Sequence, residues 1–466
     1  MIAALGSAHG RREALTGAAL GGYATLIALA PGISTKAILG APLIAVPLIW
    51  YLLRTRRAWL AAFFASALLL PPLPIHLGDS GPHIALLFAL AGLFIGLLRI
   101  AEWRFQIDSL LVSTLSLIAV AMSSLALALL YSGLLIAAAS FARVVLLGIS
   151  VYVFLYVRSG PGRMGTQQGF RCTRLLFYAA ALTAAFACVD FYFQFPAPAG
   201  YEQQFIWVDT GMFRRAQGIF YEASTLGNLC AFFLEMIAVA LFRPRKGQSP
   251  PLMALLAGGV ALAGALILSY SRGSLINLAV ALMVLFWFYR DRIRWRRVAI
   301  GASVAGACIA LLAVFSPVFS AAYWGRVSAS LQFLTESPNT VLSGRVQSWE
   351  TLLQFLASNP WHALLGVGYK TLPYSDFIGT TAVGDNTYLT LLAETGILGL
   401  CAVVALNVAI LVRSHRAARS DDDLRSFCGT WMLCFWAGQS VQMFSGDLLT
   451  YWRVLPVYFF VLALAA

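Results

Sequence analysis

The sequence predicts an all-α integral membrane protein, a polytopic bundle of about 12 to 14 transmembrane helices with one long loop outside the membrane. Hydrophobic residues make up 60% of the chain and charged residues only 11%, whereas soluble globular proteins average about 25% charged residues. Apolar runs of about 20 residues recur from end to end, and a helix of that length crosses a bilayer. These observations exclude an ordinary soluble domain.

Fourteen segments combine this length with high hydropathy, and each is expected to form a helix. They lie near residues 14–31, 36–53, 58–74, 82–98, 109–131, 133–157, 175–194, 222–242, 251–269, 272–289, 298–316, 386–412, 426–445 and 450–466. The first lacks a small-residue cleavage site and further spans follow at once. We therefore expect no removable signal peptide.

The basic residues predict the orientation, because cytoplasmic connectors are enriched in Lys and Arg. With the N-terminus inside, 23 of the 32 basic residues lie in cytoplasmic connectors, 8 lie outside and Arg143 lies within a span. The cytoplasmic connectors contain Arg11 and Arg12 and residues 54–57, 99–104, 158–174, 243–246, 290–297 and 413–425. The net charge of +13 therefore reflects membrane topology, and no nucleic-acid partner is expected.

Two outer segments are long enough to project from the membrane, residues 195–221 and residues 317–385. Long loops in compact proteins are usually functional or disordered. The second contains "GRVQSWETLLQFLASNP", which is not a low-complexity sequence. Its apolar residues share one helical face and are Val346, Trp349, Leu352, Leu353 and Leu356. We expect an amphipathic helix on the outer surface of the membrane.

Several outer arginines lie in polar segments that contain glycine: "FRRAQGIFYEAST" (213–225), "SYSRGS" (269–274) and "SGRVQSW" (343–349). The planar guanidinium group suits a phosphate or diphosphate through paired, charge-assisted hydrogen bonds. The alternative is an interfacial arginine that extends to anionic lipid headgroups. Arg272 lies in a connector of only a few residues, so its side chain is expected at headgroup depth.

Three blocks of sequence carry a family resemblance: "SYSRGSLINLAVALMVLFWF" (269–288), "SGRVQSWETLLQFLASNPWHALLGVGYKTL" (343–372) and "DNTYLTLLAETGILGL" (385–400). Their content and order resemble the O-antigen ligase/polymerase family over about residues 205–412. The resemblance implies a catalytic region at 205–412, with the periplasmic loop at 317–385. Hydropathy predicts N-terminal transmembrane helices at 1–204 and C-terminal transmembrane helices at 413–466.

The resemblance implies a GT-C-type glycosyltransferase of the bacterial inner membrane with its active face in the periplasm. Such enzymes move a glycan from undecaprenyl diphosphate to a hydroxyl on another lipid-linked glycan (polymerase) or on lipid A core (ligase). Membrane lipid, a chain-length regulator and a flippase are the further partners that this family context implies. No metal and no cofactor are expected. The seven cysteines form no CxxC pair, and "SDDDL" (420–424) lies in a basic cytoplasmic connector.

Residue by residue, Arg272 and Arg345 match arginines of the family pattern, and either Arg214 or Arg215 matches the arginine of its earlier loop. The histidine expected before Asn386 is replaced by Asp385. In the ligase branch that histidine is proposed to activate the acceptor hydroxyl. Its replacement favours an O-antigen or exopolysaccharide polymerase, with ligase as the alternative.

A diphosphate leaving group needs positive charge, and the attacking hydroxyl needs a base. Arg272 and Arg214 or Arg215 are the candidates for the first task, and Arg345 is expected to assist them or to bind glycan. Asp385 is the first candidate base. Glu222, which stands where the family often has a Pro-Asn pair, is the second.

Alternative roles are open for Asp385 and for the residues around it. Asn386 and Tyr388 are expected to contact glycan, whereas Asp385 and Asn386 could also act purely as a helix N-cap. Glu394 is expected to be a buried polar contact. His362 could replace the missing histidine or could pack at the interface.

Two rival functions remain. A lipid-linked oligosaccharide transporter or flippase should show an internal repeat and broken helices near the bilayer midplane. No clear repeat is visible in the sequence, and the polar motifs gather on one side of the membrane. A purely structural subunit would not require arginines on the disfavoured side.

Overall fold

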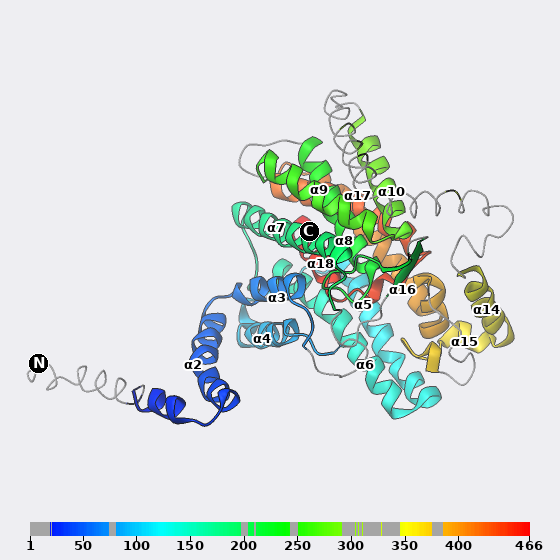
Figure 1. Cartoon of the computed structure of the whole chain (residues 1–466). Helices are drawn as coiled ribbons and strands as arrows, with labels where there is room; N and C mark the ends of the chain where they lie inside the picture. The colour runs from blue at the N-terminus through cyan, green and yellow to red at the C-terminus, as the bar shows by residue number, and fades with distance from the viewer. Residues whose placement is uncertain are drawn as a thin grey trace, which may run out of the picture. The chain divides into compact units, whose positions relative to one another are not determined.

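The computed structural model describes residues 21–73, 81–196, 204–208, 211–242, 250–290, 345–374 and 385–466, and the single positions 19, 303, 306, 310 and 328. Within these residues the chain is almost entirely α-helical (Figure 1). Two compact units are distinguished, Met1–Trp59 and Leu60–Ala466. The first contains α2 (Ile33–Arg54), and α3 (Ala58–Leu69) begins at its end.

The second unit contains all the motifs singled out in the sequence. Its longer elements are α4 (Ala85–Leu98), α5 (Ser109–Ser123), α6 (Leu125–Arg158), α7 (Thr166–Phe193), α8 (Ala223–Phe242), α9 (Leu252–Leu268), α10 (Arg272–Tyr289), α14 (Arg345–Ser358), α15 (Pro360–Leu365), α16 (Thr387–Ala418), α17 (Asp423–Gln442) and α18 (Leu455–Ala465). Its short elements are η2 (Ile100–Glu102), β1 (Phe205–Val208), β2 (Gly211–Arg214), η4 (Leu372–Tyr374) and η5 (Leu448–Thr450).

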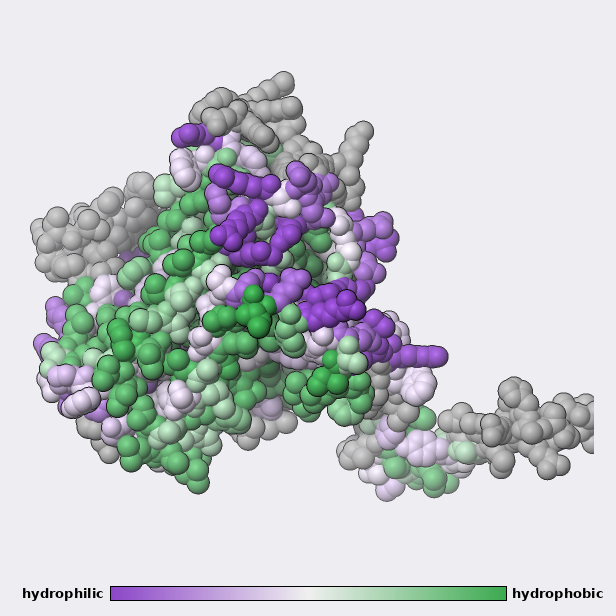
Figure 2. All heavy atoms as spheres, turned by 180° about the vertical axis from the view of Figure 1, so that it is seen from behind, coloured by the Kyte–Doolittle hydropathy of each residue, from purple (hydrophilic) through white to green (hydrophobic). Residues whose placement is uncertain are grey.

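Membrane-spanning character is confirmed by the helices themselves. Among the described residues, five helices are long and apolar enough to cross a membrane: α6, α7, α8, α10 and α16. Shorter apolar helices are α3, α4, α5, α9 and α18. Figure 2 shows a face on which hydrophobic residues cover most of the described surface and hydrophilic residues gather in one region. The fold is thus that of an all-α, multi-pass membrane protein, as predicted.

Some expected segments cannot be compared with the structure. Most of the span expected at 298–316, part of the span expected at 14–31, and the loop positions 375–384 lie outside the described residues.

One short element was not predicted: β1 and β2 form an antiparallel hairpin that pairs Phe205 with Arg214. Four-residue strands beside long apolar helices carry little periodic signal, so the sequence offered no basis for them.

Aromatic packing ties the helices near the C-terminus to α8. The ring of Phe232 lies 4.2 Å from the ring of Trp431 in α17 and 4.4 Å from that of Tyr458 in α18. All three side chains are fully buried. Large aromatic side chains bury much apolar surface and pack with defined geometry. This cluster fixes the positions of α8, α17 and α18 relative to one another.

The amphipathic helix predicted in the long loop is confirmed as α14, but Leu353, which was predicted on its apolar face, is exposed. Leu352, Phe355 and Leu356 form its buried face and pack with Val367 and Leu372. The apolar face therefore rests on the protein, rather than on lipid as the sequence suggested. The spacing of apolar residues along a helix shows that one side must be covered, but it does not show by what.

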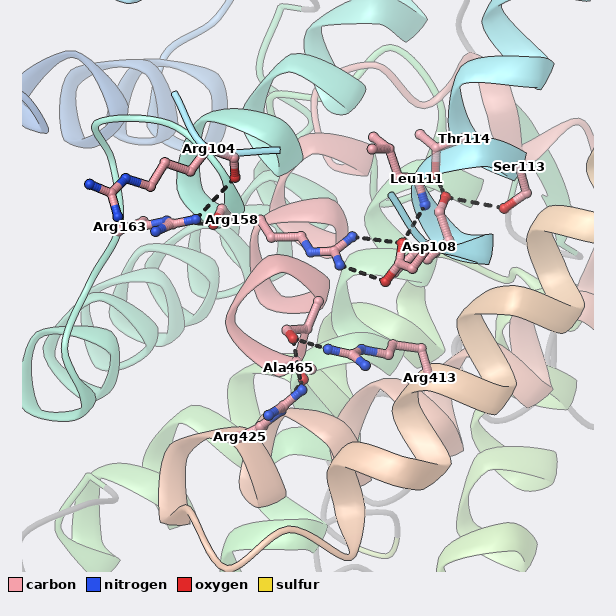
Figure 3. Close-up of polar contacts among 12 residues, drawn as sticks. Arg104, Asp108, Leu111, Ser113, Thr114, Arg158, Arg163, Arg413, Arg425 and Ala465 are labelled. Atoms are coloured by element: carbon pink, nitrogen blue, oxygen red, sulfur yellow. Dashed lines mark hydrogen bonds and ion pairs between the residues drawn. The ribbon is translucent and has the colours of Figure 1, made fainter. Parts of the chain in front are cut away.

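Polar contacts bring several of the basic connectors together. At one end, Arg158 forms two hydrogen bonds to Asp108, at 3.1 and 2.5 Å, and Arg163 donates to the carbonyl of Arg104 (Figure 3). These residues all belong to connectors, or adjoin connectors, assigned to the cytoplasm. Arg425, from another such connector, donates to the carbonyl of Ala465.

Candidate functional site

A broken helix and a glycine-rich loop form the framework of the candidate site. Gly396 interrupts α16 with φ 70° and ψ −169°, a backbone conformation that is essentially restricted to glycine. The break accompanies two contacts from the loop: Val367 N–H donates to Ala393 O at 3.2 Å, and Gly368 N–H donates to Glu394 O at 2.8 Å. Buried carbonyl groups released from a helix need such partners. The loop therefore completes the hydrogen bonding of α16.

Glu394 fastens the same loop through its side chain. Its carboxylate accepts hydrogen bonds from the backbone N–H groups of Lys370 and Leu372. One carboxylate oxygen also lies 3.9 Å from the Lys370 ammonium nitrogen. The expectation that Glu394 makes a buried polar contact is confirmed, and the contact is with this loop. A carboxylate that accepts several N–H groups is a strong anchor for a turn of backbone.

Lys370 is the main residue of this region that sequence reasoning missed. Its backbone is left-handed, with φ 59°, and its carbonyl accepts a hydrogen bond from Arg143 at 2.9 Å. Its ammonium group forms an ion pair with Asp447 in the connector between α17 and α18. Burial lowers the pKa of Lys370, and the nearby Glu394 and Glu222 carboxylates oppose that shift. Lys370 counted among the outer basic residues, but no spacing in the sequence indicates its burial.

The first turns of three helices meet around the connector that follows α17. At α16, Thr387 N–H donates to Met443 O at 2.8 Å, and the Thr387 hydroxyl donates to Gly446 O at 2.7 Å. At α10, the Ser274 hydroxyl lies 3.5 Å from Ser224 O at the start of α8. Helix N-termini carry partial positive charge, so three of them together favour an anion.

Buried amides hold the start of α10 in place. The side-chain N–H₂ groups of Asn228 and Asn277 each donate to the side-chain oxygens of Gln439 and Gln442, at 2.8 to 2.9 Å. Gln442 in turn donates to the Ser274 hydroxyl at 3.3 Å. These side chains come from α8, α10 and α17 and are buried. A network of this kind orients the Ser-Arg-Gly motif, because each amide restricts its neighbours.

Asp385 and Asn386 have different roles in the structure. The Asn386 side chain is the N-cap of α16 and accepts from Tyr388 N–H and Leu389 N–H at 3.0 and 3.1 Å. Asp385 precedes the cap, and its carboxylate lies 3.4 Å from Arg345 Nε. Asn386 therefore acts as the helix cap. Asp385 instead forms an ion pair with Arg345, the arginine of the second sequence block.

Glu222 lies beside a buried tyrosine that sequence reasoning also missed. The Ser224 hydroxyl donates to Glu222 at 2.7 Å. The Tyr451 hydroxyl lies beside Ser224. Burial raises the pKa of Tyr451 far above its usual value, and the charges of Glu222 and Asp385 raise it further. Tyr451 therefore stays protonated and places both candidate bases in one neighbourhood.

The two adjacent arginines of the earlier loop are distinguished by their partners. Arg214 is buried and forms a 2.7 Å ion pair with Asp190 in α7. Arg215 instead donates to Ser269 O at 2.7 Å, directly before the Ser-Arg-Gly motif. Arg272, in the first turn of α10, is exposed. Arg215 and Arg272 thus flank the same helix start, whereas Arg214 serves the fold.

Two further candidates are occupied by framework contacts. The Tyr388 hydroxyl donates to Ser440 O at 2.9 Å and accepts from Asn407 at 3.0 Å, which links α16 to α17. His362 is buried, and its ring stacks on Phe355 at 5.3 Å. His362 therefore packs against Phe355. Among the described residues, no group of three or more His, Cys, Asp and Glu side chains could hold a metal ion.

Comparison with known proteins gives the family of this region. Residues 257–404 match the model of a family described as O-antigen ligase. The matched segment contains all three sequence blocks, so the resemblance to the O-antigen ligase/polymerase family is confirmed there, and with it a role in cell-surface glycan biosynthesis. Arg215 and Glu222 precede the matched segment. No curated protein matches the chain.

Proposed function

We propose, from the match of residues 257–404 to a family model described as O-antigen ligase, that the chain is a polymerase that transfers glycan from undecaprenyl diphosphate to a glycan acceptor at the periplasmic face. The observation that carries the proposal is the meeting of three helix N-termini with Arg215, Arg272 and two carboxylates. This arrangement provides positive charge for a diphosphate and a base for a hydroxyl within one region.

The leaving group is the lipid diphosphate, on which negative charge grows as the glycosidic bond breaks. Arg215 and Arg272 flank the start of α10, where the helix dipole adds to their charge. Arginine can bind two phosphate oxygens at once and stays charged at any physiological pH. We assign these two arginines to the donor diphosphate, and Arg214 to the fold.

Proton removal from the acceptor is the second task. Asp385 would have to give up its ion pair with Arg345 on accepting a proton. Glu222 accepts a hydrogen bond from the neutral hydroxyl of Ser224 at 2.7 Å, and that bond can be exchanged for one to an acceptor hydroxyl. We therefore assign Glu222 as the base. Asp385, with Arg345, is assigned to orienting the glycan.

A transporter is the rival of another class, and the break in α16 is a feature expected of transporters. Here the break is filled by the loop, in which the N–H groups of Val367 and Gly368 bond the carbonyls beside it. A coordinating site would need such carbonyls to face a ligand instead. The break thus supports an anchored loop in an enzyme.

The test is the glycan profile of a strain that lacks this gene, with and without the gene restored. A polymerase predicts single repeat units on lipid A core, or loss of exopolysaccharide chains, in the deletion strain. Full-length polymer stranded on the lipid carrier would instead establish the ligase alternative. Lipid-linked repeat units retained on the cytoplasmic face would establish a flippase, and an unchanged glycan profile would overturn the proposal altogether.

A further inference from the structure

We propose that α15 lies in the membrane interface on the side of the long loop, where its exposed face contacts the acyl chains of bilayer lipid. The bend of a helical hairpin formed by α5 and α6 continues the same lipid-facing surface. The inference concerns how the long loop is anchored to the membrane, and it does not depend on the proposed reaction.

The hairpin of α5 and α6 bends at Gly133, whose φ of 79° and ψ of 172° interrupt the helical backbone of α6. Asp108, directly before α5, forms an ion pair with Arg158 at the end of α6, so both arms return to the same level. Each arm is about 25 residues and therefore about 37 Å long. The hydrocarbon core of a bilayer is about 30 Å thick. If the charged pair marks one interface, the bend reaches the other.

The long loop follows this hairpin from the bend towards the membrane interior. The ring of His362 in α15 lies 5.4 Å from the ring of Tyr131, two residues before the bend. Tyr369 N–H donates to the Ser124 hydroxyl at 3.1 Å. Ser124 precedes Tyr131 by seven residues, which is about 10 Å along a helix. α15 is therefore level with the bend, and Tyr369 lies deeper.

The backbone at this depth is bonded within the protein. The carbonyls of Tyr369 and Lys370 accept hydrogen bonds from the side chains of Ser140 and Arg143 in α6. Non-helical backbone is tolerated at membrane depth only where protein surrounds it in this way. The loop thus enters the protein below the level of α15, and α15 is the part of the loop that remains at the interface.

α15 is apolar on opposite sides. Its sequence, PWHALL, contains no Asp, Glu, Lys or Arg. One side is buried, with the His362 ring stacked on Phe355. The other side exposes Trp361, Leu364 and Leu365, and Trp361 is 73% exposed. These three residues share a face because they are spaced by three and four positions. A helix that is hydrophobic all round is buried in protein or in a membrane.

α14 differs from α15 on its exposed side. Gln347, Glu350 and Gln354 form a polar stripe that is exposed, although Leu353 is also exposed beside it. A polar stripe of this kind faces water. The exposed surface becomes apolar at Pro360, where α15 begins. The boundary between water and lipid is therefore expected between the two helices.

The neighbouring surface indicates that lipid covers α15. Leu130, Leu134 and Leu135 lie around the bend and are 71 to 81% exposed. They belong to α6, which is long and apolar enough to cross a membrane. α15 contacts this helix through Tyr131, and the two lie side by side in Figure 1. The exposed face of α15 thus continues a membrane surface. Tryptophan is enriched at this level of membrane proteins, as Trp361 would be.

The experiment is quenching of tryptophan fluorescence in the full-length protein, reconstituted in phosphatidylcholine vesicles. The emission of Trp361 is the part lost in Trp361→Phe, and Leu364→Trp and Leu135→Trp each add one reporter. Val145→Trp is a matched control on α6, because Val145 is exposed and lies twelve residues beyond the bend, about 18 Å deeper. Gln354→Trp places a reporter on the polar stripe of α14.

Phosphatidylcholine brominated near the headgroup end of its acyl chains should quench Trp361 and the reporters at 364 and 135 strongly. Phosphatidylcholine brominated near the chain ends should quench them less, and aqueous iodide should have little effect. The reporter at 145 should show the reverse preference between the two lipids. The reporter at 354 should be quenched by iodide and not by either lipid.

Quenching of the two α15 reporters by iodide alone would place α15 in water and overturn the inference. Protection of both from lipid and iodide would show that protein covers this face, and it would also overturn the inference. Stronger quenching by bromines near the chain ends would contradict the interfacial depth. If Trp361→Phe does not fold, Leu364→Trp and Leu365→Trp report on the same face.

Discussion

Gly366 and Gly396 face each other across the junction of the long loop and α16. A Cβ atom on Gly366 would lie 2.3 Å from Glu394 O, and one on Gly396 would lie 2.2 Å from Leu364 O. Both glycines also have positive φ angles. The Leu-Gly-x-Gly and Glu-x-Gly segments of the sequence are therefore two halves of one backbone contact.

Gly396→Ala should lower the stability of the protein by about 2 kcal/mol or more, because it adds backbone strain to a clash with a carbonyl that cannot move freely. Thermal unfolding of the purified protein measures the effect. Gly259→Ala in α9 is the control, since its new Cβ would lie at an ordinary 3.5 Å from Ile237. Equal unfolding temperatures for the two variants would refute the contact.

Arg272→Ala should abolish polymer formation while the protein remains in the membrane in normal amount. The side chain is exposed, so its loss should remove charge for the diphosphate without opening a cavity. The measurement is glycan chain length in a complemented deletion strain, with membrane protein level as the control. Wild-type chain length in this variant would reject the assignment of Arg272.

Arg214→Ala should lower the stability of the protein, whereas Arg215→Ala should lower its activity. Loss of Arg214 leaves Asp190 buried without its partner, so the variant should be destabilised by about 3 kcal/mol or more. Arg215→Ala should fold normally and lose activity, because its guanidinium group lies beside the start of α10. Unfolding temperature and polymer formation are measured for both. The reverse pattern would exchange their assigned roles.

Glu222→Gln and Asp385→Asn distinguish the two carboxylates. Loss of a general base typically costs about 10²- to 10⁴-fold in rate, so Glu222→Gln should be nearly inactive. Asp385→Asn weakens only the contact with Arg345 and should show a smaller loss, mainly in apparent substrate affinity. Rates in membrane vesicles that contain the lipid-linked donor test this. A larger loss in Asp385→Asn would return the base assignment to that residue.

His83 should make stability depend on pH. Its Nε2 donates to Leu70 O at 3.0 Å, and its Nδ1 accepts from Ala85 N–H at 3.1 Å, so the fold selects the neutral ring. Burial, with a contribution from Arg453, lowers the pKa of His83 from 6.5 to about 4. The contribution to stability is therefore complete above pH 6.5 and falls as the pH drops towards 4.

The loss between these pH values should reach about 3 kcal/mol, because the unfolded chain takes up a proton that the folded protein resists. The unfolding temperature measured across this range, compared with His83→Asn, isolates the effect. His83→Asn cannot titrate, so its unfolding temperature should fall less on acidification. Parallel curves for the two proteins would contradict the assignment.

The candidate site could be predicted in part. The sequence blocks correctly located the starts of α10 and α16 and the amphipathic α14, because helix starts and apolar faces follow from neighbouring residues. The choice between Arg214 and Arg215 could not be predicted. Both side chains have the same chemistry, and only the position of Asp190, 24 residues from Arg214, separates them.

By itself the sequence determined the membrane class, the positions of most described helices and the three motif blocks, because hydropathy and capping are local properties. The tertiary structure decided that Lys370 is buried between Asp447 and Glu394, and that Tyr451 lies beside Ser224. Arg143 reaches the Lys370 carbonyl across 227 residues of chain. Such contacts depend on how helices pack, and no spacing along the chain specifies which buried charges will meet.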